Sequence, residues 1–148
     1  MLAATALVAA SYLVSVRWYV LYYEKEPWDA AAALVARAAQ GGDLILFHAS
    51  WVQIPFDHYF HDLHPSIEER GVPTDLFGRG ELEPKMALSD LPHLRALLDG
   101  HARVWLVYSH NWYTDPAGLV PSTLQQMLVL QQRYALPEIQ ISLFVQPP

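Results

Sequence analysis

The sequence contains no cysteine in its 148 residues. Disulfide bonds, zinc sites built on thiolates and cysteine nucleophiles are therefore excluded, while the cellular compartment stays open. Positive charge is also scarce, because nine Lys and Arg stand against fifteen Asp and Glu, for a net charge of −6. Surfaces that bind nucleic acid need a basic patch or stripe. The composition therefore argues against nucleic acid as a partner.

Charged residues make up only 16% of the chain, whereas hydrophobic residues make up 53%. This balance excludes a disordered tail, and the length is that of about one domain. The apolar excess is concentrated at the N-terminus. We therefore expect one hydrophobic core, preceded by a separate apolar segment.

The N-terminal segment carries no charge before Arg17 and stays apolar and aromatic as far as Tyr23. A helix of that length would measure about 35 Å, enough for a hydrocarbon core of about 30 Å. Its aromatic cluster at 18–23, beside Arg17 and Lys25, is typical of an interfacial belt. The segment predicts a transmembrane helix at 1–23 and a soluble α/β domain at 24–148.

Two other interpretations of the N-terminal segment are a cleaved signal peptide and a buried helix of a soluble protein. A signal peptide is disfavoured because no basic residue precedes Arg17. The cations Arg17 and Lys25 follow the segment, which by the positive-inside rule favours a cytoplasmic domain, although helices upstream could override so few charges.

The remaining sequence alternates helical and strand-like patterns. Apolar runs at the strand positions are short and continuous, as in strands covered on both faces. This alternation predicts a Rossmann-like three-layer domain with about four mainly parallel strands, and leaves the direction of the last strand open. The expected helices are 29–40, 52–63, 90–98 and 121–134, and the expected strands are 44–47, 72–77, 104–108 and 139–145.

Polar and aromatic side chains follow the first and third predicted strands. In open α/β sheets ligands gather at the carboxyl ends of the strands, so these two segments are the candidate binding site. Histidine, tryptophan and an acid together would suit a sugar or a headgroup. The structural alternative is that the tryptophans cover the sheet edge and the histidines hydrogen-bond locally. The candidate substrate-binding residues are His48, Trp51, Gln53, Asp57, His110, Trp112 and Asp115.

Metal and hydrolase sites are weakly supported. The histidines at 58, 61 and 64 recur every three residues, which spreads them over about 120° of a helix, and a proline follows at once. No metal site is predicted. Ser109 and His110 are neighbours at a strand end, so their side chains should point to opposite faces, and no Gly-x-Ser-x-Gly elbow is present.

The glycines do not form a nucleotide-binding loop. Gly41 and Gly42 precede the first strand of the domain, whereas such a loop must follow a strand and open a helix. We interpret them as the end of a helix, and predict no cofactor. The charged segment 79–85 is interpreted as a solvated connection.

The phrases at 22–28, 42–47, 51–57 and 104–110 resemble the C-terminal end of bacterial membrane glycosyltransferases of the family 39 kind, in the GT-C superfamily. The resemblance implies glycosyl transfer from a polyprenyl-phosphate sugar donor to a glycan or lipid acceptor. The acidic catalytic residues of that family lie in an early loop that no segment here matches, so no catalytic residue is expected. The resemblance also implies a cell-membrane location with an extracytoplasmic domain.

These expectations combine into one hypothesis. The chain would be the C-terminal domain of such a transferase, in contact with the lipid bilayer, capping the membrane site or assisting acceptor binding. The first alternative is a free-standing membrane-anchored binding or scaffold module. The second is a small membrane-tethered hydrolase, which would need His48, Asp57 and His110 to converge.

Overall fold

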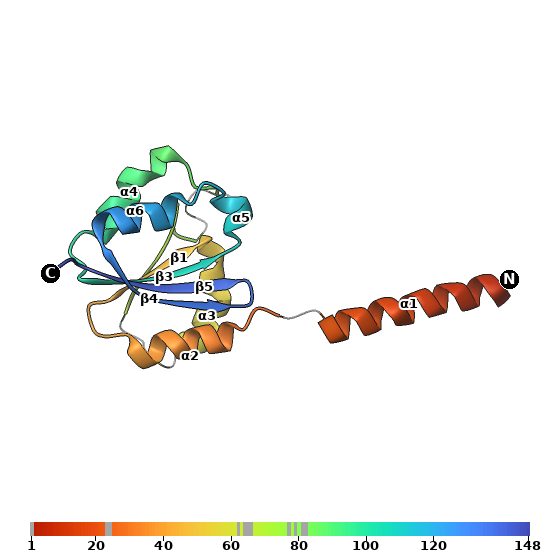
Figure 1. The fold of residues 1–148 in the computed structure, drawn as a ribbon. Coiled ribbons are helices and arrows are strands. Elements are labelled where there is room, and N and C mark those ends of the chain that lie inside the picture. The colour runs from red at the N-terminus through yellow and green to blue at the C-terminus, as the bar shows by residue number, and fades with distance from the viewer. Residues whose placement is uncertain are drawn as a thin grey trace.

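A computed structural model of the chain describes residues 2–22, 25–61, 63, 67–76, 78, 80 and 83–148. The described part contains one sheet with helices on both faces (Figure 1). The helices are α1 (Leu2–Tyr22), α2 (Trp28–Ala38), η1 (Ser50–Val52), α3 (Gln53–Phe60), η2 (Leu88–Asp90), α4 (Leu91–Leu98), α5 (Asn111–Thr114) and α6 (Leu119–Met127). The strands are β1 (Leu44–His48), β2 (Glu68–Gly71), β3 (Arg103–Ser109), β4 (Val129–Leu136) and β5 (Ile139–Val145).

The sheet has five strands in the order β2-β1-β3-β5-β4. β1 pairs in parallel with both β2 and β3, while β5 is antiparallel to both β3 and β4. The predicted α/β class is confirmed. The prediction of about four mainly parallel strands is wrong, because β4 and β5 form an antiparallel hairpin that adds one strand and reverses direction.

Alternation along the central strands divides the core into two layers. Ile45 and Phe47 on β1 belong to a cluster with α2 and α3, while Leu44 and Leu46 belong to a cluster with α4 and α6. β3 divides in the same way. Figure 1 shows the result, with α2 and α3 on one face of the sheet and α4, α5 and α6 on the other. The sheet is therefore covered on both faces, as the continuous apolar runs predict.

Two element predictions are corrected in position. The second strand is Glu68–Gly71, not 72–77, and it lies at the edge of the sheet. The helix predicted for 121–134 ends at Met127, and the residues from Val129 onward form β4. The run after Met127 has side chains that suit a helix, but pairing with β5 in the sheet overrides that local propensity.

The N-terminal helix α1 projects away from the sheet and its covering helices (Figure 1). Its apolar side chains that the structure describes are mostly exposed, among them Leu7, Val8 and Trp18. Among the described residues, no helix has both the length and the apolar character needed to cross a membrane. The predicted transmembrane helix is corrected by this finding.

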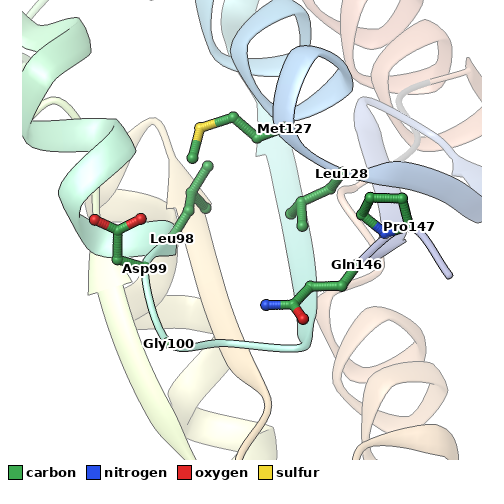
Figure 2. Close-up of a pocket in the computed structure, with 7 residues that line it drawn as sticks. All are labelled: Leu98, Asp99, Gly100, Met127, Leu128, Gln146 and Pro147. Carbon is green, nitrogen blue, oxygen red and sulfur yellow. The ribbon is translucent and has the colours of Figure 1, made fainter.

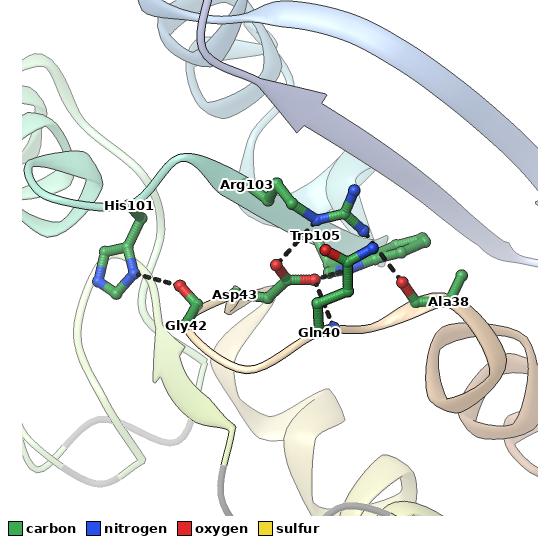
Figure 3. Close-up of polar contacts among 7 residues, drawn as sticks. All are labelled: Ala38, Gln40, Gly42, Asp43, His101, Arg103 and Trp105. Carbon is green, nitrogen blue, oxygen red and sulfur yellow. Dashed lines mark hydrogen bonds and ion pairs between the residues drawn. The ribbon is translucent and has the colours of Figure 1, made fainter.

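A buried carboxylate ties the amino ends of β1 and β3 to the end of α2 (Figure 3). Asp43 accepts hydrogen bonds from Arg103 Nε at 2.9 Å, from Trp105 Nε1 at 2.8 Å and from the backbone N–H of Gln40 at 3.0 Å. Arg103 also donates to the Ala38 carbonyl at 3.0 Å. Since a buried charge needs such partners, these residues act structurally, at the sheet edge opposite the candidate site.

Candidate functional site at the carboxyl ends of β1 and β3

A cavity of about 220 Å³ lies beyond the carboxyl ends of β1 and β3. We call it the aromatic pocket; it is lined by Trp51, Glu83, His110, Trp112 and Tyr113. Trp51 comes from η1, directly after β1, and the residues from 110 to 113 come from the segment after β3. Because β1 and β3 are parallel neighbours, their carboxyl ends bring these two segments together.

The rings of the pocket face one another at contact distance. The ring centroids of Trp51 and His110 are 5.6 Å apart with an interplanar angle of 65°, an edge-to-face arrangement. Those of Trp112 and Tyr113 are 5.7 Å apart. Trp112 is 73% exposed, so a large aromatic surface lies open to a ligand. Indole rings left open beside a cavity are typical of binding sites, since burying them on binding stabilises the complex.

The backbone of His110, a lining residue of the pocket, has an unusual conformation. His110 has a φ of 54°, in the left-handed region that few residues other than glycine adopt, and it stands between β3 and α5. This turn reverses the expected strand alternation. The prediction that Ser109 and His110 point to opposite faces is therefore wrong, since Ser109 Oγ lies 2.9 Å from His110 Nδ1.

One side of the His110 ring is held by protein groups. Nδ1 contacts the Ser109 hydroxyl, and Glu26 Oε1 lies 3.6 Å away. Ser109 itself donates to the Glu138 carbonyl at 2.7 Å, and Trp28 Nε1 holds the other Glu26 oxygen at 3.2 Å. A carboxylate and a hydroxyl oxygen around Nδ1 favour the tautomer with the proton on Nδ1. Nε2 is then a hydrogen-bond acceptor available to a ligand.

This arrangement is not a serine-hydrolase site. Ser109 is fully buried, and its hydroxyl contacts Nδ1, the same ring nitrogen that Glu26 approaches. In a hydrolytic triad the nucleophile and the acid contact opposite ring nitrogens. The hydrolase alternative also required His48, Asp57 and His110 to converge, yet of these three only His110 lines the aromatic pocket.

His48 has a structural role. Its side chain is fully buried, with Nδ1 3.1 Å from the Val72 carbonyl and Nε2 2.9 Å from Thr114 Oγ1. Burial lowers the pKa of His48, while the charge of Asp115 and the Val72 carbonyl act in the opposite direction. A neutral ring that donates from Nδ1 and accepts from the Thr114 hydroxyl satisfies both nitrogens.

Asp115 is buried and holds the start of α6. Its carboxylate accepts hydrogen bonds from the backbone amides of Leu119 at 2.8 Å and Val120 at 2.9 Å, and from the Tyr108 hydroxyl at 2.8 Å. Burial, together with the hydrogen bond and charge of Asp115, raises the pKa of Tyr108 above its usual range. Asp115 thus stabilises the orphan amides of a helix N-terminus.

Gln53 and Asp57 form a separate polar group with Glu69. Gln53 and Asp57 lie on α3, and Gln53 Nε2 donates to Glu69 Oε2 on β2 at 3.2 Å. The pKa of Glu69 is raised to about 8, first by burial and then by the hydrogen bond and charge of Asp57. Among the described groups, Asp57 Oδ1 is buried without a hydrogen-bond partner. Neither Gln53 nor Asp57 lines the aromatic pocket.

The predicted site residues therefore fall into two groups, those that line the aromatic pocket and those that do not. Trp51, His110 and Trp112 meet in one cavity, whereas His48 and Asp115 are internal. The sequence analysis missed Glu83, Tyr113 and the orienting residue Glu26. Tyr113 was within the segment singled out after the third predicted strand, so its aromatic character was a usable signal. Glu83 lay in the segment interpreted as a solvated connection.

A larger cavity, of about 290 Å³, lies at the opposite edge of the sheet (Figure 2). Side chains from the ends of α4 and α6 and from the residues after β5 surround it, including Leu98, Met127 and Gln146. Its one ionisable lining residue is Asp99. The amino ends of the parallel strands lie here, and open sheets rarely bind ligands at that end. We therefore prefer the aromatic pocket as the candidate binding site.

Metal binding finds no support among the residues described. No group of three or more His, Asp or Glu there could hold a metal ion. His58 and His61 lie at the exposed end of α3, and His64 falls outside the described residues.

Comparison with known proteins gives no family. No family model matches the sequence, and neither does any curated protein. One solved structure that the chain is similar to is a TehB-like SAM-dependent methyltransferase from Corynebacterium glutamicum, at 11% identity and a TM-score of 0.36, covering 96% of this chain and all of that one. Similarity this low supports no inference about activity.

The predicted resemblance to family 39 glycosyltransferases is wrong. No family model supports it, and no described helix could span a membrane. The function and cell-membrane location inferred from that resemblance are corrected with it.

Proposed function

We propose that the chain is an α/β module that binds a small ligand in the aromatic pocket. The observation that carries this proposal is the meeting of Trp51, His110 and Trp112, from two segments far apart in the sequence, around one cavity of about 220 Å³. Two indoles and an oriented imidazole at the carboxyl edge of parallel strands match the general pattern of binding sites, which combine apolar walls with a few placed polar groups.

The polar groups around the pocket support binding rather than catalysis. His110 is oriented by Glu26 and Ser109, so its Nε2 can accept a hydrogen bond from the ligand. The serine is buried, and the ionisable side chains that line the cavity beside His110 are, among the described residues, those of Glu83 and Tyr113. A positioned hydrogen-bond acceptor beside aromatic side chains can fix the orientation of a ligand. Bond cleavage would in addition need an accessible nucleophile or a placed general acid or base.

The test uses the indole N–H signals of the five tryptophans in ¹⁵N-edited NMR spectra. The spectra are recorded with a panel of methyl glycosides, amino acids, carboxylic acids and quaternary amines. We expect at least one class to shift the Trp51 and Trp112 signals in a saturable way. Trp105 is an internal control, because its N–H is bonded to Asp43 at the opposite edge.

The variant Trp112→Ala should weaken binding of the active probe by about tenfold, since it removes one wall of the cavity. Tyr59→Ala is the matched control, because Tyr59 is also an exposed aromatic residue but lies on α3 outside the pocket. If no probe shifts Trp51 or Trp112, or if all five indoles move alike, the proposal is wrong.

A further inference from the structure

We propose that the ligand of the aromatic pocket is a small organic cation with a methylated ammonium group. This inference rests on the proposed function and adds the chemical class of the ligand. The first argument is the chemistry of the walls. Trp51, Trp112 and Tyr113 line the pocket, and the faces of such rings carry the negative part of the aromatic quadrupole, which attracts cations within about 6 Å.

Charge at the rim has the matching sign. Glu83 is the acid among the five lining residues, and none of the five is Lys or Arg. Glu26 lies behind His110, and the chain as a whole carries −6. The Glu83 carboxylate in the lining therefore favours a cationic ligand over an anionic one.

The rim already holds one cation. Lys85 Nζ lies over the Tyr113 ring, 4.0 Å from its centroid. Such a contact places an ammonium group against the negative face of an aromatic ring, the arrangement that a cationic ligand of the pocket would use. Lys85 is not among the described residues that line the cavity, and its charge repels an incoming cation.

The supply of hydrogen bonds also favours a methylated cation over a sugar. A sugar presents several hydroxyl groups, and leaving them unpaired in a binding site costs free energy. The described lining offers His110 Nε2, the Glu83 carboxylate and the Tyr113 hydroxyl as side-chain acceptors, and the Tyr113 hydroxyl and the two indole N–H groups as donors. A methylated ammonium needs no hydrogen bonds, and one hydroxyl on the same molecule would suit His110 Nε2.

The experiment compares two probes of nearly equal shape in the full-length chain. Choline carries a quaternary ammonium, and 3,3-dimethylbutan-1-ol replaces its nitrogen by carbon and is neutral. Dissociation constants come from titration of the Trp112 indole signal. We expect choline to bind at least about tenfold more tightly than the alcohol, because only choline gains from the rings and from Glu83.

Two substitutions separate charge from shape. Glu83→Gln should weaken choline binding severalfold, and Lys85→Met should strengthen it, while both leave the neutral alcohol unchanged. Asp99→Asn, an exposed acid at the opposite edge of the sheet, is the matched control and should change neither constant. Thermal unfolding of each variant confirms that the fold is retained.

A further arm compares choline with phosphocholine, to distinguish a free amine from an esterified headgroup that carries the same ammonium. Binding of either well above the neutral alcohol supports the proposal. Equal binding of choline and the alcohol at Trp112 overturns it, while the proposed binding function stands. Failure of both probes, with no other compound of the panel active, overturns both proposals.

Discussion

The carboxyl groups of Asp57 and Glu69 illustrate what a residue's neighbours do to its chemistry. Two carboxylates in contact repel each other, and burial removes the water that would stabilise both charges. Glu69 accordingly holds its proton to a pKa of about 8, against 4.5 for a free glutamate. At neutral pH the pair shares a proton, and Gln53 also donates a hydrogen bond to Glu69.

This raised pKa has a consequence for stability. The unfolded chain loses the Glu69 proton near pH 4.5, whereas the folded chain keeps it until about pH 8. Over that window the unfolded state binds fewer protons, so the contribution of Glu69 to stability is complete below pH 4.5 and is lost as the pH rises through 8. We predict that Glu69→Gln flattens the fall in urea-unfolding free energy between these values.

The control for this prediction is Asp99→Asn. Asp99 is an exposed acid that follows α4, which packs on the face of the sheet opposite α3. Its substitution should leave the pH profile of the unfolding free energy parallel to that of the unmodified protein. If the Glu69→Gln profile is also parallel to that of the unmodified protein, the raised pKa of Glu69 is not the cause of the fall in stability.

The hairpin of β4 and β5 is the element that changes the sheet from parallel to mixed. Leu136 pairs with Ile139, so Pro137 and Glu138 form the turn. Glu138 has a φ of 58°, in a region where glycine is favoured, and its carbonyl accepts the Ser109 hydroxyl behind the aromatic pocket. The turn therefore contributes to the support of His110.

We predict that Glu138→Gly stabilises the fold by about 0.5 to 1 kcal/mol, because glycine adopts a positive φ without steric cost. The hydrogen bond from Ser109 is to the backbone and should survive. Urea denaturation measures the change. As a control, Ala135→Gly places the same residue in the extended part of β4 and should destabilise by a similar amount. A loss of stability in Glu138→Gly would show that the Glu138 side chain matters more than its backbone.

For the whole molecule, two apolar clusters on opposite faces of one sheet form the core, and α1 belongs to neither. The exposed side chains of α1 point in all directions around the helix, so it has no single face to pack against the domain. The aromatic pocket depends on residues from Glu26 onward. The part of the chain from Lys25 to Pro148 therefore contains both the core and the site.

We predict that a chain of residues 25–148 unfolds within about 2 °C of the full-length protein, because less than about 0.5 kcal/mol is expected from exposed residues that belong to neither core cluster. Differential scanning calorimetry measures the transition, and the indole signals of Trp51 and Trp112 report the pocket. A shorter chain of residues 29–148, which also lacks Glu26 and Trp28, is the comparison and should show altered indole signals of Trp51 and Trp112. Loss of cooperative unfolding in the 25–148 chain would show that α1 supports the core.

Much of the α/β pattern was readable from sequence. The run at 44–47 and the run at 139–145 are short, apolar and bounded by turn residues, and both are strands with nearly those bounds. Such signals are local, since a strand covered on both faces must be apolar throughout. The residues from Val129 to Tyr134 were misassigned for the same reason, because what makes them a strand is the pairing with β5, which lies outside any local window.

The candidate site was readable only in part. The rule that ligands lie beyond strand ends selected Trp51, His110 and Trp112, which line one cavity, and their role in binding stays a proposal. It could not tell that His48, the last residue of β1, turns inward to Val72 and Thr114. Glu26 and Ser109 are 83 residues apart and meet only because the segment before α2 lies near the end of β3.

By itself the sequence determined the absence of thiol chemistry, the acidic charge, the alternation of helices and strands, and the two segments from which the pocket is built. The tertiary structure alone decided the strand order, the antiparallel hairpin, the isolation of α1 and the orientation of each site residue. The physical reason is that composition and periodicity act over a few neighbouring residues. Which side chains meet depends on strand pairing and on single backbone angles, such as the φ of 54° at His110.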